Sequence, residues 1–123
     1  NVIDSRVKSA ASLLGITGVL DKKLRAISDA EKQRVALGRA IVCQPKVLLV
    51  DEDFARQNDD RRHEMISDIL KINERLGITV LYVTNDYDEV CALNKKTVFM
   101  KEGKIVEVRD NPGQTEKIQS EKI

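Results

Sequence analysis

The segment VLLVDE, residues 47–52, places four apolar side chains directly before two carboxylates. A continuous apolar run of this length is typical of a strand buried on both faces, as in a parallel sheet. Asp51 and Glu52 then emerge at the C-terminal end of that strand, which is the edge where open α/β sheets bind ligands. One carboxylate there can hold Mg²⁺, often through water, and its neighbour can orient a water that attacks a phosphate. Taken alone, the segment fits equally well a strand that simply ends in a loop.

Helical patterns precede this segment. Apolar residues at helical spacing predict a helix over residues 3–14, which Asp4 can cap. Ser28, followed three positions later by Glu31, is typical of a capping box and predicts a second helix that ends before Pro45.

The alternation of helices and strands continues after the segment. A long helix is expected to open at Asp59 or Asp60, to close at Gly77 and to bury an apolar stripe of Met65, Ile69, Ile72 and Leu76. After it we expect a strand over residues 78–83 and a short helix that is capped by Asp86 with Glu89 and reaches Leu93. A hairpin is expected next, with strands over 97–100 and 104–108 joined at Glu102-Gly103. This order predicts an α/β domain with a mostly parallel sheet.

Composition excludes several classes of function. A net charge of +1 without a basic run argues against nucleic acid as a partner. The longest apolar run, residues 47–50, is far too short to cross a bilayer. Cys43 and Cys91 have no metal-ligand spacing and are expected to be buried thiols inside helices of a cytosolic protein. The sole histidine, His63, is expected to be solvated.

Three motifs stand in a fixed order along the chain. The segment LRAISDAEKQRVALGRAI, residues 24–41, is similar to the Leu-Ser-Gly-Gly-Gln signature and the Gln-Arg-Val-Ala helix that follows it. VLLVDE then stands at the distance of the Walker B motif, and LYVTND, residues 81–86, resembles the switch segment Tyr-Val-Thr-His-Asp. KEGKIVE, residues 101–107, looks like the closing hairpin. Together these motifs resemble the ATP-binding domain of ABC transporters. The resemblance runs from about Val7 to Val108 and lies closest to the ATPase subunits of sugar- and polyamine-type importers.

The resemblance implies a partial RecA-like core of the P-loop NTPase fold, a mostly parallel sheet with flanking helices, together with part of the ABC helical subdomain. Residues 1–44 would then belong to the helical subdomain with its signature helix, residues 45–108 to the C-terminal half of the core, and residues 109–123 to a polar tail.

Mg-ATP is the cofactor that the resemblance implies. Asp51 would hold Mg²⁺ through water, Glu52 would act on the attacking water, and Asn85 stands at the position of the switch histidine. Asn58 stands in the loop that crosses the dimer interface in the family. Ser28, Asp29, Ala30 and Glu31, here called the signature-position segment, would face the ATP of the opposite subunit.

These motifs also depart from the family pattern. The 123 residues contain no Gly-x-x-x-x-Gly-Lys-Ser/Thr loop to hold the β- and γ-phosphates, so ATP binding by this chain alone is expected to be weak or absent. Asp29 and Ala30 occupy the two glycine positions of the signature. A carboxylate about 4 Å from a phosphate charge costs about 4 kcal/mol at an effective dielectric near 20. Asn85 cannot carry the charge of a histidine, and Asn58 lacks a carboxylate, so the site is expected to be catalytically degenerate.

A final expectation concerns partners. In the resembling family the phosphate-loop strand lies between the strands expected here at 78–83 and 97–100, so its absence leaves unpaired edges that invite another chain. The chain begins at Asn1 rather than at Met, and we expect a missing N-terminal half, a strand-swapped second copy or a rearranged sheet. Transporter membrane subunits at the inner face of the cell membrane are the further partners implied. Three readings stay open: part of an importer subunit, a non-catalytic interaction or regulatory module, and a defective fragment with no function of its own.

Overall fold

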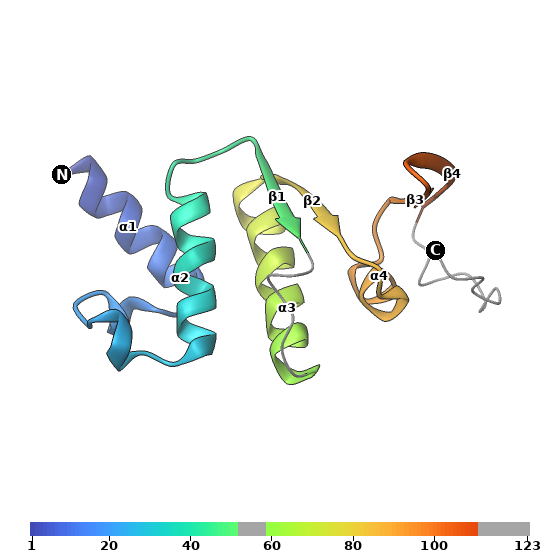
Figure 1. The fold of residues 1–123 in the computed structure, drawn as a ribbon. Coiled ribbons are helices and arrows are strands. Elements are labelled where there is room, and N and C mark those ends of the chain that lie inside the picture. The colour runs from blue at the N-terminus through green and yellow to red at the C-terminus, as the bar shows by residue number, and fades with distance from the viewer. Residues whose placement is uncertain (52–58, 111–123) are drawn as a thin grey trace. The chain divides into compact units, whose positions relative to one another are not determined.

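The computed structural model describes residues 1–51 and 59–110 (Figure 1). Its contacts divide the chain into two compact units, Asn1–Tyr82 and Val83–Ile123, and each is described by itself. No helix in the described ranges is both long and apolar enough to cross a membrane.

The first unit opens with helix α1, Val2–Leu13. Asn1 caps it, because its side-chain oxygen accepts a hydrogen bond from the backbone N–H of Asp4 at 3.0 Å. The prediction that Asp4 is the cap is therefore wrong: the helix starts earlier than expected, and Asp4 lies in its first turn. Two short 3₁₀ turns, Thr17–Val19 and Leu24–Ala26, lead from α1 to the next helix.

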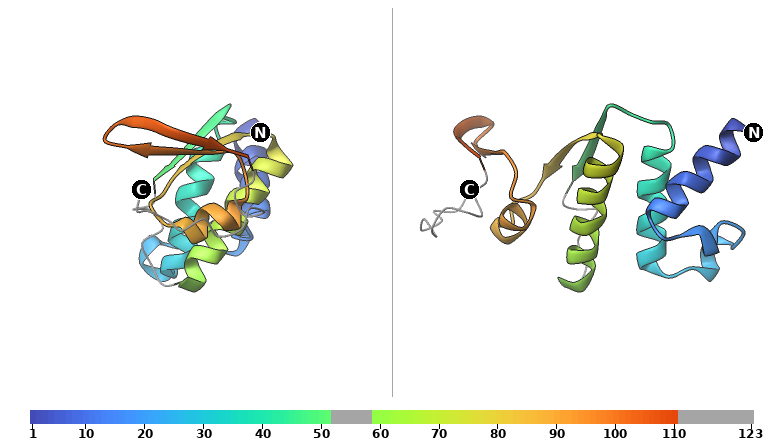
Figure 2. Two further views of the ribbon diagram at one scale, coloured as in Figure 1. Left: turned by 90° about the vertical axis from the view of Figure 1, so that its right-hand side faces the viewer. Right: turned by 180° about the vertical axis from the view of Figure 1, so that it is seen from behind.

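Helix α2, Asp29–Ile41, begins with the predicted capping box. It packs against α1, and in the views of Figures 1 and 2 it lies beside the long helix α3, Asp59–Leu76. Cys43 follows the end of α2 in a turn and is exposed, so the prediction of a buried helical thiol is wrong there. Cys91 lies in a helix as predicted, but it is only half-buried.

Strands β1, Val47–Asp51, and β2, Thr79–Val83, form a two-stranded sheet whose arrows point the same way in Figure 1. The apolar stripe of α3 contributes side chains that are among the most buried of the first unit, with Met65, Ile69 and Ile72 at most 2% exposed. The end of α3 is fixed to the start of β2 because the Asn73 side chain donates a hydrogen bond to the backbone oxygen of Ile78 at 2.9 Å.

Strand β1 is buried on one face only. Leu48 and Val50 are buried, whereas the alternating Val47 and Leu49 are 52% and 71% exposed. Leu81 of β2 is also exposed. The expectation of burial on both faces is wrong for the described residues, because they supply cover for one face of the sheet alone. Val47, Leu49 and Leu81 are called the open face below.

The second unit contains helix α4, Tyr87–Leu93, and a hairpin of strands β3, Thr97–Lys101, and β4, Lys104–Arg109. Asp86 caps α4 as predicted, although its side chain accepts from the N–H of Asp88. The hairpin turns at Glu102 and Gly103, which have φ of 50° and 75°. The described strands therefore form two separate two-stranded sheets.

Candidate functional site

The signature-position segment forms the first turn of α2. The Ser28 hydroxyl oxygen accepts a hydrogen bond from the backbone N–H of Glu31 at 3.1 Å, and the Glu31 carboxylate accepts one from the backbone N–H of Ser28 at 3.2 Å. This reciprocal bonding satisfies backbone donors that a helix start otherwise leaves free. The backbone and side-chain hydrogen bonds from Ser28 hold the pKa of Glu31 below its ordinary value, since they favour the charged carboxylate.

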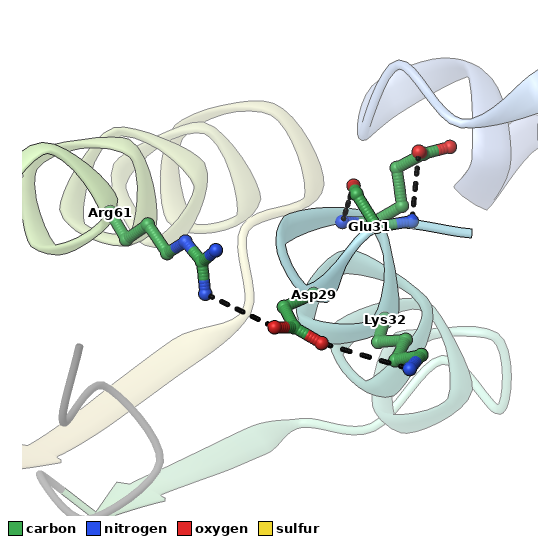
Figure 3. Close-up of polar contacts among 5 residues, drawn as sticks. Asp29, Glu31, Lys32 and Arg61 are labelled. Atoms are coloured by element: carbon green, nitrogen blue, oxygen red, sulfur yellow. Dashed lines mark hydrogen bonds and ion pairs between the residues drawn. The ribbon is translucent and has the colours of Figure 1, made fainter. Parts of the chain in front are cut away.

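The Asp29 carboxylate forms ion pairs with two cations (Figure 3). Its Oδ1 lies 3.6 Å from Lys32 Nζ, one helical turn along α2, and its Oδ2 lies 3.9 Å from Arg61 Nη1 at the start of α3. The Asp29 side chain remains 64% exposed. Solvent and both cations therefore reduce the field of this carboxylate, so its repulsion of a phosphate is weaker than that of an isolated charge.

A second ion pair joins α2 to α3 further along the two helices. Arg34 Nε donates to Asp68 Oδ2 at 3.0 Å, and Arg34 Nη2 lies 4.0 Å from Glu64 Oε2. The Asp68 side chain is only 4% exposed, so this carboxylate depends on its cationic partner. Arg61 and Asp68 are not among the residues predicted from the sequence. Asp68 could have been found, because it interrupts the buried stripe of Met65 and Ile69, whereas nothing in the pattern around Arg61 indicates its contact.

The remaining predicted residues are placed as follows. Asp51 is exposed at the C-terminal end of β1, as expected for the last residue of a strand at the sheet edge. Asn85 is exposed between β2 and α4, in the second unit. Glu52 and Asn58 lie outside the described residues. Ala30 is half-buried in the first turn of α2.

The structure thus brings Ser28, Asp29 and Glu31 together at one helix start, while Asp51 lies at the end of β1. Among the described residues, no cluster of three or more His, Cys, Asp or Glu side chains forms a metal site. Asp51, the last residue of β1, offers a carboxylate, a group that binds Mg²⁺ directly or through water, so its assignment as the Mg²⁺ residue stays a prediction.

Comparisons with known proteins agree with the motif order. The ABC transporter family model matches residues 1–55. The oligosaccharide import ATP-binding protein MsmX of Bacillus subtilis is 42% identical over 106 residues, which are 86% of this chain and 29% of that protein. The trehalose/maltose import ATP-binding protein MalK of Thermococcus litoralis is 39% identical over 119 residues, covering 92% of this chain and 32% of that protein. The spermidine/putrescine import ATP-binding protein PotA of Borrelia garinii is 38% identical over 108 residues, covering 88% of this chain and 31% of that protein.

The fold of the chain is also similar to solved structures of ABC transporter components. The ABC transporter component cbiO1 of Clostridium perfringens superposes with a TM-score of 0.81 at 30% identity, covering 89% of this chain and 44% of that one. An ATP-binding cassette in its ADP conformation superposes with a TM-score of 0.82 at 21% identity, covering 93% of this chain and 44% of that one, and supports the fold alone.

The chain spans about a third of the length of the relatives it matches. The fold prediction is confirmed: the helices and strands belong to a partial P-loop NTPase domain. From the three ordered motifs, the identities and the superposition together, this chain belongs to the ABC transporter family and corresponds to part of its ATP-binding domain.

Proposed function

We propose that this chain is part of an ATP-binding, energy-coupling subunit of an ABC-type importer, and that it is not an ATPase on its own. The observation that carries the proposal is the signature-position segment, which starts α2 with an intact capping box, while Asp51 ends β1 at the sheet edge. In this function Asp51 positions Mg²⁺ through water, Glu52 acts on the attacking water, and Asn85 takes the place of the switch histidine. Ser28, Asp29, Ala30 and Glu31 face ATP bound by another subunit, and Asn58 lies at the subunit interface.

The proposed assembly includes polypeptide that supplies the phosphate-binding loop, as a further part of the same protein or as another chain. The open face of the β1–β2 sheet supports this, because apolar side chains that are 52–71% exposed in neighbouring strands are more stable under cover. The matched regions are 29% and 32% of the named relatives, so those proteins have room for such a segment. Residues 1–44 serve as part of the helical subdomain and residues 45–108 as half of the core. Membrane subunits then place the assembly at the cytoplasmic face of the membrane.

The test is complementation with a phosphate loop. The part of a relative such as MsmX that this chain does not match is mixed with the chain, and Mg-ATP binding is followed by calorimetry. We expect no heat from the chain alone and binding by the mixture, with the Asp51→Asn variant weakening it at least tenfold. Glu74→Gln, which removes an exposed carboxylate from α3, is the control and should bind as the parent does. Binding by the chain alone, or an Asp51→Asn mixture that matches the parent, would refute the assignment.

A second candidate is a non-catalytic interaction or regulatory module that keeps the ABC scaffold. The specific observation that favours it is Asp29 at a glycine position of the signature, held by two cations of the same chain. A mixture that associates without binding Mg-ATP would support this candidate over the first.

A further inference from the structure

Two ion pairs connect helices α2 and α3 at different positions along their axes. Asp29 near the start of α2 faces Arg61 near the start of α3, and Arg34 of α2 bonds to Asp68 of α3. Arg34 lies five residues after Asp29, and Asp68 lies seven residues after Arg61, so both pairs follow the chain in the same direction. The signs alternate between the pairs: the anion is on α2 in the first and on α3 in the second.

This arrangement selects one register of α2 against α3. Sliding one helix along the other by the distance between the pairs would bring Asp29 towards Asp68 or Arg34 towards Arg61, and each of these contacts joins like charges. The alternating charges therefore disfavour the shifted registers of α2 against α3 as well as stabilising the observed register.

The two pairs act with different strength. Asp68 is buried and bonded directly at 3.0 Å, whereas the Asp29–Arg61 contact is longer, at 3.9 Å, and its side chains are 64% and 31% exposed. The Arg34–Asp68 pair is thus the more buried of the two, and the Asp29–Arg61 pair is the one that joins the first turn of α2 to α3.

We infer that Arg61 is a positioning residue for the signature-position segment: through Asp29 it fixes the first turn of α2 to the start of α3. The contact joins two residues of this chain. Its meaning for transport rests on the proposed function, in which this turn faces ATP and α3 begins just after the segment that follows Asp51.

Amide hydrogen exchange of the chain without nucleotide tests the link. The reporter in α2 is the Glu31 amide, which donates to Ser28, and the reporters in α3 are the amides of Glu64 and Met65, in the turn that follows Arg61. We expect Arg61→Gln and Asp29→Asn each to speed exchange at both ends by about twofold to fivefold, the range for a partly exposed ion pair. In the Arg61→Gln background, Asp29→Asn should have a smaller effect than in the parent, since the link is already broken.

Three comparisons separate this role from a general loss of stability. Arg61→Lys keeps the charge and should restore parental exchange, because a contact of 3.9 Å is a charge pairing rather than a forked hydrogen bond. Lys32→Gln removes the other cation near Asp29 but should leave the α3 reporters unchanged, since Lys32 is on the same helix as Asp29. Exchange at Ile72 and Ile69, in the core, should not change. Strictly additive effects of the two variants, or changes confined to α2, would overturn the inference. Failure of the complementation with Mg-ATP would leave the exchange result standing, so the two failures are distinguishable.

Discussion

At the scale of single residues, the first turn of α2 combines an intact capping box with the ion-paired carboxylate of Asp29. Ser28 and Glu31 form the capping box that the spacing predicts, because this motif depends on residues only three positions apart. The charge of Asp29 was also evident from the sequence, but its environment was not. Lys32 is a local neighbour, whereas Arg61 reaches Asp29 through the packing of another helix.

Glu31 gives the capping box a pH dependence. Its pKa is lower in the folded chain than its ordinary value of 4.5, chiefly because the backbone N–H of Ser28, and then the Ser28 side chain, hydrogen-bond with the carboxylate. A carboxyl group whose pKa falls on folding stabilises the fold above its unfolded pKa, and this contribution is lost as the pH falls through the folded value. We expect the stability advantage of the parent over Glu31→Gln to shrink below pH 4.5, the ordinary pKa of the carboxyl group. Urea unfolding of both proteins from pH 6 down to about pH 3 measures this; a difference that stays constant would contradict it.

At the scale of secondary-structure elements, α3 separates what a periodic pattern predicts from what packing decides. The stripe of Met65, Ile69, Ile72 and Leu76 correctly predicts the helix and most of its buried face. Leu76, however, is 49% exposed, because it is the last residue of α3 and the chain turns away at Gly77, with φ of 65°. The helical period gives the face of a residue, but it does not indicate how far the neighbouring elements extend.

Truncation of the stripe should follow exposure and not the pattern. Ile72 is fully buried, so Ile72→Ala should lower the free energy of unfolding by about 2–5 kcal/mol through lost burial and the cavity left behind. Leu76→Ala removes a similar side chain from the same stripe and should cost about 1 kcal/mol or less. Urea or thermal unfolding of the two variants compares them directly. Equal losses would show that Leu76 is covered in solution.

At the scale of the whole molecule, each of the two units carries exposed apolar strand residues. In the first unit the open face comprises Val47, Leu49 and Leu81, and in the second the hairpin exposes Val98, Met100, Ile105 and Val108. A continuous apolar run makes a strand that is buried on both faces only if other elements pack against both faces of the sheet. The exposed apolar side chains of the open face therefore support the proposal that further polypeptide completes this domain.

A charge on the open face should reduce association without unfolding the chain. Leu49 is 71% exposed, so Leu49→Lys should change the free energy of unfolding by less than about 0.5 kcal/mol. It should nevertheless weaken self-association of the chain, or its assembly with the part of a relative that this chain does not match, by at least tenfold, because a lysine ammonium resists burial against apolar side chains.

Leu24→Lys is the matched control, since Leu24 is 66% exposed but lies outside the sheet. Sedimentation velocity over a range of concentrations distinguishes the variants. Equal effects of the two substitutions would mean that the open face is not the surface that associates.

The sequence by itself determined the order of helices and strands, the capping box of α2 and membership of the ABC transporter family, because these depend on local spacing and on motifs in a fixed order. It also indicated Asp51 at the end of a strand, since four apolar residues before a carboxylate form a local pattern. Only the tertiary structure decided that β1 is covered on one face, that Asp68 is buried against Arg34, and that Arg61 reaches Asp29. The two ion pairs join residues more than thirty positions apart, and the cover of β1 comes from other elements. Such contacts are set by how the elements pack, which local propensity and periodicity do not determine.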